Sequence, residues 1–372
     1  MRAGALRVLV VDDSALMRQW IADLLNSDPE IEVVGTARDG WDALNKIEAL
    51  QPTVVTLDLA MPQLSGLDLL RMLAVERSLP VVVVTGVGDT DLTFQALEEG
   101  AVDFVLKPSG PVSGDIAKVR DELVAKVKLA ARVNLKEMFR SLQARSAAPA
   151  LAKARQGMPS MPIVAIGAST GGPQAVRRVL QGLPRGFQAP VLVVQHMPDE
   201  FTGPFAERMG RVVSLVVREA QEGDVLEPGV VYVAPGGAHM KICRDAQTGA
   251  LQVTLDHGPP VNGVRPSVDV LFHSLAEVAG PEVVAVVLTG MGEDGAEGIR
   301  ALKARGATTL AQDAPSSTVF GMPRAAAETG AVDHVLPLEA IPQALVRLVG
   351  EKAARLRRRS GTLKQGPGRA TG

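Results

Sequence analysis

The sequence predicts two α/β domains in tandem. The first is a doubly wound (βα)5 domain with a parallel sheet, and the second is larger, with a mostly parallel sheet and an antiparallel hairpin region. Short β-branched runs alternate with amphipathic segments along most of the chain, as in parallel sheets covered by helices on both faces. The 372 residues are also enough for about two domains of ~150 residues each.

The first domain is expected over residues 6–124, where five strand–helix units follow one another. The segment Ser14–Ser27, for example, has apolar side chains at helical spacing. The expected strands are Leu6–Val11, Ile31–Thr36, Thr53–Leu57, Val81–Thr85 and Val102–Leu106. Ligands of doubly wound domains bind at the carboxyl ends of the strands, so functional side chains are expected there.

The rest of the chain divides into three segments. Residues 125–159 are rich in Ala, Ser and basic residues and are expected to form the end of a helix and a linker. The strand–helix alternation resumes over residues 160–350, where short strands between Val230 and Asp256 are expected to pair as hairpins. Residues 351–372 carry seven Lys and Arg against one Glu, which is typical of a disordered basic tail.

Composition excludes several classes of protein. The net charge of −2 and an aromatic content of 3% argue against a nucleic-acid binder, which needs basic surfaces and exposed rings. A single cysteine, Cys243, excludes an internal disulfide and fits a reducing compartment. We see neither a signal peptide nor an apolar run of the ~20 residues that a membrane span needs. The expected location is the cytoplasm.

Five polar side chains fall at the expected carboxyl ends of the first domain's strands. Asp12 and Asp13 follow the first strand, Asp58 the third, Thr85 ends the fourth and Lys107 follows the fifth. Clustered carboxylates repel one another unless a cation lies between them, and Mg²⁺ prefers such oxygen ligands. A carboxylate beside Mg²⁺ and a lysine could accept a phosphoryl group. Taken singly, each residue could instead be a helix cap, a strand end or a surface charge.

The segments VLVVDDSALMR, VVTLDLAMPQLSG, VVVVTG and DFVLKP resemble the signature segments of response-regulator receiver domains, over about 120 residues. The resemblance implies Asp58 as the phosphoacceptor, Mg²⁺ bound by Asp12, Asp13 and Asp58, phosphoryl contacts from Thr85 and Lys107, and Phe104 as the aromatic switch residue. Two positions depart from the commoner pattern. Ala60 and Ser65 stand where a polar residue and an aspartate, respectively, are frequent.

The second domain contains the turn GASTGG, between an expected strand and an expected helix. Ser169 in this turn matches the G-x-S-x-G pattern, in which a sharp turn exposes a nucleophilic hydroxyl. The same pattern is compatible with a helix cap or a phosphate-binding loop. Both standard nucleotide-loop patterns are missing from the sequence here, which disfavours a nucleotide site.

A nucleophilic serine needs a base and an acid that orients the base. His196 is the best base by position, because it ends a strand expected beside the one that leads to Ser169, and His239 is next. Asp294 follows another strand end and is either the orienting acid or the cap of the helix after it. The other histidines are expected to be structural or in a loop: His273, His334 and His257. No HExxH spacing occurs, which disfavours metal-dependent hydrolysis.

Six further segments resemble the catalytic domain of chemotaxis protein-glutamate methylesterases, over about residues 160–350: IGASTGGPQA, VVQHMP, FTGPFAERM, VYVAPGGAHM, NGVRPSVDVLF and LTGMGEDGAEGI. The order of the two domains also matches this family. The resemblance implies Ser169 as nucleophile, His196 as general base and acid, and Asp294 as its orienting partner. Thr170 and Met291 are candidates for the shell around the oxyanion.

The same resemblance implies a phosphorylation-activated serine hydrolase. It would remove methyl esters from glutamates of chemoreceptor cytoplasmic helices, release methanol and deamidate certain glutamines, which gives sensory adaptation. A chemotaxis histidine kinase would be the phosphodonor. Ester hydrolysis would need no cofactor. The protein would bind no nucleic acid and would reach membranes only through receptors. The unphosphorylated first domain is expected to cover the catalytic cleft. The alternative is a phosphorylation-switched module that binds a nucleotide or phosphoprotein without hydrolysis.

Overall fold

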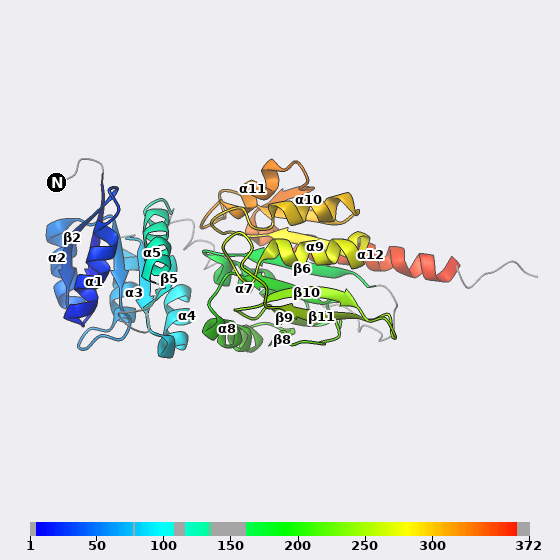
Figure 1. The fold of residues 1–372 in the computed structure, drawn as a ribbon, viewed down its shortest axis with the longest axis horizontal. Coiled ribbons are helices and arrows are strands. Elements are labelled where there is room, and N and C mark those ends of the chain that lie inside the picture. The colour runs from blue at the N-terminus through cyan, green and yellow to red at the C-terminus, as the bar shows by residue number, and fades with distance from the viewer. Residues whose placement is uncertain (1–4, 77–78, 108–115, 134, 136–160, 363–372) are drawn as a thin grey trace, which may run out of the picture. The chain divides into compact units, whose positions relative to one another are not determined.

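The computed structural model describes residues 5–76, 79–107, 116–133, 135 and 161–362. The chain forms two compact units, divided between residues 144 and 145. Each unit has its own sheet and its own hydrophobic core (Figure 1). The predicted fold class, two α/β domains, is confirmed.

The first unit contains a five-stranded sheet in the order β2-β1-β3-β4-β5, with every neighbouring pair parallel. Its strands lie within a residue or so of the predicted ones: β1 Leu6–Val11, β2 Ile31–Ala37, β3 Val54–Leu57, β4 Val81–Thr85 and β5 Asp103–Leu106. Its helices are α1 Ala15–Asn26, α2 Gly40–Leu50, α3 Gly66–Glu76, α4 Thr90–Glu98 and α5 Ile116–Ala130, with a 3₁₀ turn η1 at Val87–Asp89. The strand order reverses between β1 and β3, which places a crevice at their carboxyl ends.

Short polar side chains begin the first two helices. Ser14 Oγ accepts a hydrogen bond from Met17 N of α1 at 3.4 Å, and Asp39 Oδ1 accepts one from Asp42 N of α2 at 2.9 Å. Each bond satisfies a backbone donor that lacks a partner within the helix. Ser14 is therefore a helix cap.

Helix α5 continues past residue 124, the predicted end of the first domain, into the segment where the end of a helix and a linker were expected. Leu123, Val127 and Ala130 are fully buried in the core of the first unit, together with residues of β1 and α1. Burial of this apolar stripe explains why the helix extends beyond the predicted end of the domain. Most of the predicted linker lies outside the described residues.

The second unit contains a seven-stranded sheet in the order β14-β13-β12-β6-β7-β9-β8, again with every neighbouring pair parallel. The strands are β6 Ile163–Ala168, β7 Val191–Gln195, β8 Val216–Glu219, β9 Val230–Val233, β12 Val283–Val287, β13 Thr308–Gln312 and β14 His334–Leu336. The helices are α7 Gly172–Gln181, α8 Asp199–Val212, α9 Val268–Val278, α10 Ala296–Ala304, α11 Met322–Glu328 and α12 Ile341–Thr362, with 3₁₀ turns η2 Gly280–Glu282 and η3 Leu338–Ala340.

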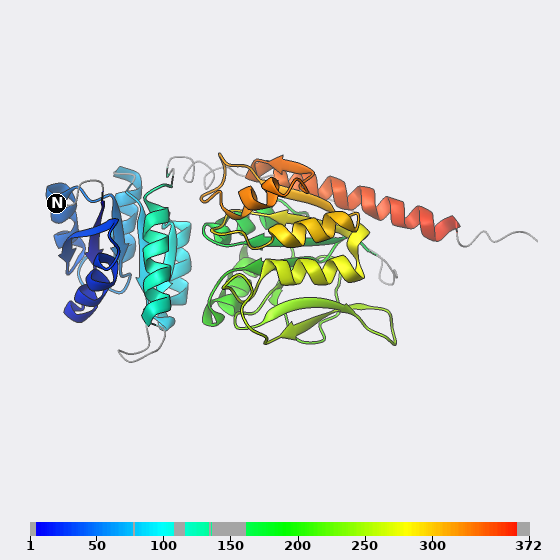
Figure 2. The ribbon, with the colours of Figure 1, turned by 45° about the horizontal axis from the view of Figure 1, so that its top comes forward.

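An antiparallel hairpin, β10 His239–Arg244 with β11 Leu251–Asp256, forms a separate two-stranded sheet. The hairpin confirms the prediction of antiparallel pairing in this region. Strand β9, which was also expected to pair as a hairpin, does not. This strand pairs in parallel with β7 and β8, and its residues Tyr232 and Val233 are buried in the main sheet. Figure 2 shows α9 between the hairpin and α10, and α9 contacts both.

The structure also differs from the sequence analysis over residues 351–362. Helix α12 runs to Thr362, and its inner face buries Leu345, Leu348, Val349 and Ala353. These apolar residues lie on one face of the helix, and Ala353 continues this face into the segment predicted to be a basic tail. Residues 363–372 of that tail lie outside the described residues.

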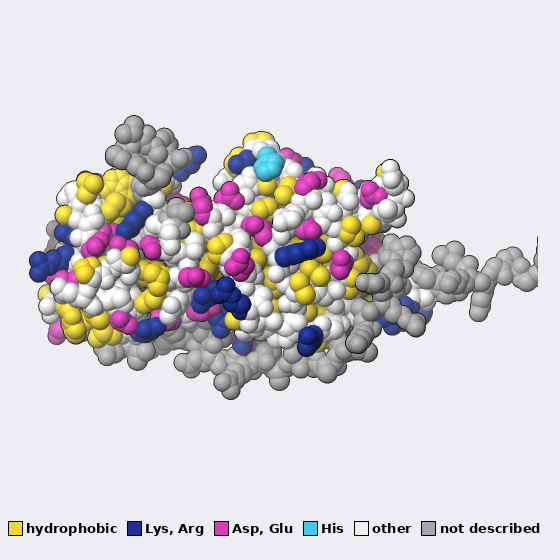
Figure 3. All heavy atoms as spheres, turned by 90° about the horizontal axis from the view of Figure 1, so that it is seen from below, with side chains coloured by type: hydrophobic (Ala, Val, Ile, Leu, Met, Phe, Trp, Pro, Cys, Tyr) yellow, Lys and Arg dark blue, Asp and Glu magenta, His cyan; other side chains and the backbone are white. Residues whose placement is uncertain are grey.

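Two surface features are relevant to the predicted function classes. Among the helices of the described ranges, none is long and apolar enough to cross a membrane. Acidic and basic side chains are interspersed on the face shown in Figure 3, in line with a net charge close to zero.

Candidate functional site

Ser169 lies in a sharp turn that joins strand β6 to helix α7. The turn is closed by a hydrogen bond from Gly172 N to Ser169 O at 2.7 Å. Gly171 adopts a left-handed backbone with φ of 73°, which favours glycine. Gly171 is also the N-cap of α7, and no side chain caps this helix. The alternative in which the Ser169 hydroxyl caps α7 is therefore wrong, and its side chain is half-buried at the carboxyl edge of the sheet.

Close packing fixes the path of this turn. A Cβ atom on Gly172 would lie 2.0 Å from Gln195 Oε1, and one on Gly290 would lie 2.8 Å from Ser169 Cβ. Thr289 Oγ1 donates a hydrogen bond to Thr170 O at 2.9 Å. The backbone of Ser169 is thus held between the ends of β7 and β12.

His196 follows the strand beside the one that leads to Ser169. Strands β6 and β7 are parallel neighbours, with Ala168 opposite Gln195, and His196 N donates to Ala168 O at 3.0 Å. The buried amide of Gln195 donates to Ser169 O at 2.9 Å and to His196 O at 3.1 Å. The serine and the histidine therefore leave the sheet side by side.

Asp294 contacts the far nitrogen of the imidazole. Its Oδ2 lies 2.8 Å from His196 Nε2, and the carboxylate is buried. A carboxylate can only accept this hydrogen bond, so Nε2 carries a proton, and in the neutral form of the ring Nδ1 is the basic nitrogen. An imidazole held in this tautomer can take a proton from a neighbouring hydroxyl.

The amino end of α9 holds the Asp294 carboxylate. Oδ2 accepts from Val268 N at 2.6 Å, and Oδ1 accepts from Ser267 Oγ at 2.7 Å and from Asp269 N at 3.2 Å. Helix amino ends favour negative charge. Asp294 was predicted either to orient a base or to cap the following helix, α10, but the N-cap of α10 is Gly295, and there is no side-chain cap. Asp294 interacts with the N-terminus of α9 instead.

This environment keeps Asp294 ionised. Burial is the largest single influence and by itself raises the pKa of the carboxyl. The hydrogen bond from His196 and the charge of its protonated ring, with the bonds from Ser267 and Val268, outweigh burial and lower the pKa to about 2. The site therefore holds a buried carboxylate next to the imidazole at neutral pH.

The other candidate base, His239, lies in β10 away from this pair. Its Nδ1 accepts a hydrogen bond from Ser267 N at 3.1 Å, and its Nε2 lies 3.0 Å from Pro259 O. Both ring nitrogens are used and the residue is buried, so His239 supports the backbone of the Ser267 segment. His273 lies in α9 and His334 in β14, as predicted.

The two candidates for the oxyanion shell lie on the segments that flank Ser169. Thr170 is buried in the turn itself, while Met291 is 45% exposed and follows Gly290, which packs against Ser169. Both belong to the loops around the serine.

In the first unit, three carboxylates meet at the carboxyl ends of β1 and β3. Oxygens of Asp12, Asp13 and Asp58 lie within 4.8 Å of one another. Lys107 Nζ lies 2.8 Å from Asp12 Oδ2 and 2.7 Å from Asp58 Oδ2. The sequence analysis expected these residues to converge, and the topology brings them together.

The charges at this edge affect one another. Burial raises the pKa of Asp12, the hydrogen bond and charge of Lys107 lower it and the charge of Asp58 raises it, so that the pKa lies above its usual value. Burial lowers the pKa of Lys107, but its bonds to Asp12 and Asp58 outweigh burial and raise it. One ammonium facing three carboxylates leaves a net negative site of hard oxygen donors, which fits Mg²⁺.

Thr85 and Phe104 lie on the two strands next to this site. Thr85 is fully buried, its Oγ1 accepts from Thr93 Oγ1 at 3.2 Å, and its carbonyl accepts from Lys107 N at 2.7 Å. Phe104 is buried, with the Lys126 ammonium 5.3 Å from its ring centre. Thr85 is thus beside Lys107 at the strand ends, while Phe104 lies within β5.

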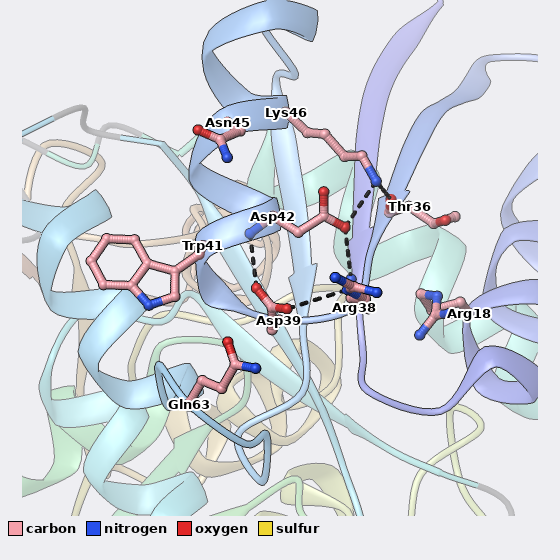
Figure 4. A pocket seen from close by; sticks show the side chains of 9 residues that line it. All are labelled: Arg18, Thr36, Arg38, Asp39, Trp41, Asp42, Asn45, Lys46 and Gln63. Carbon is pink, nitrogen blue, oxygen red and sulfur yellow. Dashed lines mark hydrogen bonds and ion pairs between the residues drawn. The ribbon is translucent and has the colours of Figure 1, made fainter.

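A shallow polar hollow lies near the amino end of α2 (Figure 4). Lys46 Nζ bonds Asp42 Oδ2 at 2.9 Å and Thr36 O at 2.6 Å, and Arg38 lies 3.5 Å from Asp39. These charges are therefore paired with one another across the hollow.

The sequence analysis did not identify the residues that hold Asp294. Asn262, Ser267 and Asp269 all lie in the segment NGVRPSVDVLF, which was quoted only for its family resemblance. A usable signal was present, because Ser267 two residues before an acidic residue is typical of a helix start. Gln195 gave no such signal, since its role depends on the pairing of β6 with β7.

Two family models match the chain. The CheB methylesterase family matches residues 164–345, and the response regulator receiver domain matches residues 8–114. Neither description is that of a nucleotide-binding or phosphoprotein-binding module.

Curated relatives match almost the whole chain. Protein-glutamate methylesterase/protein-glutamine glutaminase of Geobacillus kaustophilus is 47% identical over 93% of this chain and 99% of its own length. The protein of the same name from Pyrococcus abyssi is 46% identical over 92% of this chain and 94% of its own length. Among solved structures, the CheB methylesterase catalytic domain of Thermotoga maritima is 43% identical, with a TM-score of 0.49, over 51% of this chain and 99% of that domain.

Proposed function

Because the chain belongs to the CheB methylesterase family, with a receiver domain ahead of the catalytic domain, we propose that it is a phosphorylation-activated protein-glutamate methylesterase and protein-glutamine glutaminase. The single observation that carries this proposal is the hydrogen bond between His196 and the buried carboxylate of Asp294, at the strand end beside Ser169. Together these three residues supply a nucleophile, a base and an orienting acid.

In the proposed reaction, Ser169 Oγ attacks the γ-carbonyl carbon of a glutamate methyl ester while His196 Nδ1 takes the hydroxyl proton. The tetrahedral intermediate collapses and expels methanol, which receives that proton. Water, deprotonated by the same imidazole, then attacks the acyl-serine and releases the glutamate and Ser169. For a glutamine the leaving group is ammonia, and the remaining steps are the same.

Asp294 stabilises the imidazolium that forms in each step. Its low pKa supports this role, because the carboxylate stays charged while the ring gains a proton. The backbone around Thr170 and Met291 flanks Ser169, and its N–H groups are our candidates for binding the oxyanion.

We propose phosphorylation of Asp58 as the activating event. Asp12, Asp13 and Asp58 would hold Mg²⁺, which would neutralise the charge of the transferring phosphoryl group. Lys107 would bind a phosphoryl oxygen from the position that it now shares between Asp12 and Asp58. Thr85 lies at the same edge and would contact the phosphoryl group, and Phe104 would change its packing.

The substrates proposed are glutamate and glutamine side chains on the cytoplasmic helices of chemoreceptors, and the phosphodonor is a chemotaxis histidine kinase. These partners place the enzyme in the cytoplasm, with no nucleic acid and no direct membrane contact. We also propose that the unphosphorylated receiver domain restricts access to Ser169, and that phosphorylation relieves this restriction.

Methanol release from receptor membranes with methylated glutamates tests the proposal. The Ser169→Ala variant should lower the rate by ~10³-fold or more and leave phosphorylation of Asp58 intact. Ser214→Ala, which removes an exposed hydroxyl elsewhere in the same unit, should match the wild type. Near-normal turnover by the Ser169 variant would exclude this serine as the nucleophile.

A further inference from the structure

Asn262 occupies a tight turn close to the proposed catalytic acid. Val261 and Val264 exchange two backbone hydrogen bonds, at 3.1 and 3.0 Å, around the pair Asn262-Gly263. Both central residues have positive φ, 54° and 76°, as a type I′ turn requires. Gly, Asp and Asn all suit such a position, so the turn itself does not require a carboxamide at residue 262.

The Asn262 side chain bridges two buried carboxylates. Its Nδ2 donates to Asp294 Oδ1 at 3.0 Å and to Asp269 Oδ2 at 2.8 Å, which uses both of its N–H groups. The two carboxylates are only 3% and 5% exposed. Of the three residues compatible with the turn, only asparagine can donate a hydrogen bond to both acids at neutral pH.

The ionisable groups that act on Asp269 are Asp294 and His273. Burial raises the pKa of Asp269, Gly298 N lowers it by a hydrogen bond, and the charge of Asp294 raises it again. His273 favours the charged form of Asp269, and His239 lies behind Ser267 with both nitrogens bonded. Asp294 is therefore the carboxylate in direct contact with His196, and Asp269 is connected to Asp294 through the Asn262 side chain.

We propose that Asn262 is a positioning residue for the proposed esterase site. Its carboxamide fixes the rotamer of Asp294 and disperses part of the carboxylate charge, and thereby limits the basicity of His196. The inference rests on the proposed function for the identity of the reaction, but the effect on the imidazole does not depend on any substrate. Without the bridge, the undispersed charge of Asp294 would stabilise the imidazolium more strongly.

Two substitutions at residue 262 test this directly. Asn262→Gly keeps the positive φ and removes the amide, while Asn262→Asp keeps the turn and the shape and replaces a donor with a carboxyl group. NMR titration of the His196 ring in the full-length protein should give the lowest pKa for the wild type. The pKa should rise in Asn262→Gly and rise further in Asn262→Asp, which adds a negative charge.

Kinetics provide a second readout. Asn262→Gly should lower kcat by about tenfold, as expected for the loss of one hydrogen bond to a charged group, with KM within about twofold. Asn262→Asp should be slower still at neutral pH, but its kcat relative to wild type should recover as the pH falls, because the protonated carboxyl can donate again. A purely structural role would not produce this recovery.

Gln51→Gly is the matched control, because it also removes an exposed side chain at a left-handed position, at the end of α2. It should leave both the His196 pKa and kcat unchanged. An unchanged His196 pKa in Asn262→Gly, or equal kcat ratios for Asn262→Asp at every pH, would overturn the inference. Failure of the proposed function would instead appear as full activity in Ser169→Ala, whatever the titrations show.

Discussion

Replacing Asp294 with asparagine changes one atom at the centre of the site, and the neighbouring hydrogen-bond donors determine its effect. In the more favourable orientation the new NH2 group replaces Oδ2 and meets Val268 N and His196 Nε2, both of which are donors in the folded chain. Val268 N then loses its acceptor, and the imidazole can only adapt by moving its proton to Nδ1. In that tautomer the ring has no basic nitrogen for Ser169.

The size of the effect follows from the pKa of Asp294. A fall from 3.8 to about 2 means that the folded site prefers the carboxylate over the neutral acid by about 2 kcal/mol. An unsatisfied buried donor adds roughly 1–3 kcal/mol. We therefore expect Asp294→Asn to destabilise the second unit by about 3 kcal/mol at pH 7, or ~6–12 °C in Tm. The wrong tautomer should lower kcat by about 10³-fold or more.

The pH dependence of stability has a definite sign. The folded pKa of Asp294 is depressed, so its contribution is complete above the unfolded value, near pH 4, and disappears as the pH falls through about 2. The difference in Tm between wild type and Asp294→Asn should therefore narrow between about pH 4 and pH 2.

The assays are calorimetry of the full-length protein across this pH range and methanol release at pH 7. Glu297→Gln makes the same chemical change at an exposed carboxylate in α10 and should shift Tm by less than about 2 °C. A Tm difference that stays constant from pH 7 to pH 2 would refute the electrostatic argument. Unchanged kcat would refute the role of Asp294 in setting the imidazole tautomer.

The remaining predictions concern packing and phosphorylation. Gly290→Ala should lower both kcat and Tm, because its Cβ would lie 2.3 Å from Met322 Sδ and 2.8 Å from Ser169 Cβ; Gly350→Ala, with open space around it, should do neither. Asp58→Asn should keep basal methanol release but lose all activation by a small phosphodonor, and activation that survives would place the phosphoacceptor elsewhere. Chelation with EDTA should block labelling of Asp58 by the phosphodonor without lowering basal methanol release; labelling that continues in EDTA would contradict the Mg²⁺ assignment.

The predicted strands agree closely with the observed ones because both sheets are buried on two faces. Runs such as Leu6–Val11 and Ile163–Ala168 are apolar at nearly every position, and this pattern is hard to mistake for a surface helix. Domain ends were less predictable. Helix α5 passes residue 124 and α12 passes residue 350, in each case because an apolar stripe is buried against a core that lies far away in the sequence.

In the candidate site, too, some features could be predicted from the sequence and others could not. Ser169, His196 and Asp294 could be selected from the sequence, since each follows a run typical of a buried strand, and parallel strands present their carboxyl ends at one edge. The sequence could not reveal that Asp294 binds the amino end of α9 instead of capping α10. That contact depends on where a helix 25 residues earlier in the chain is packed.

The sequence by itself therefore determined the two α/β domains, their order and the residue types at the strand ends, because hydrophobic periodicity and turn chemistry are local properties. Only the tertiary structure decided which nitrogen of His196 faces Asp294, that His239 is a structural residue, and that Asn262 joins two buried acids. Each of these depends on hydrogen bonds between segments distant in sequence, and directional contacts of that kind form only once the sheet and α9 are packed together.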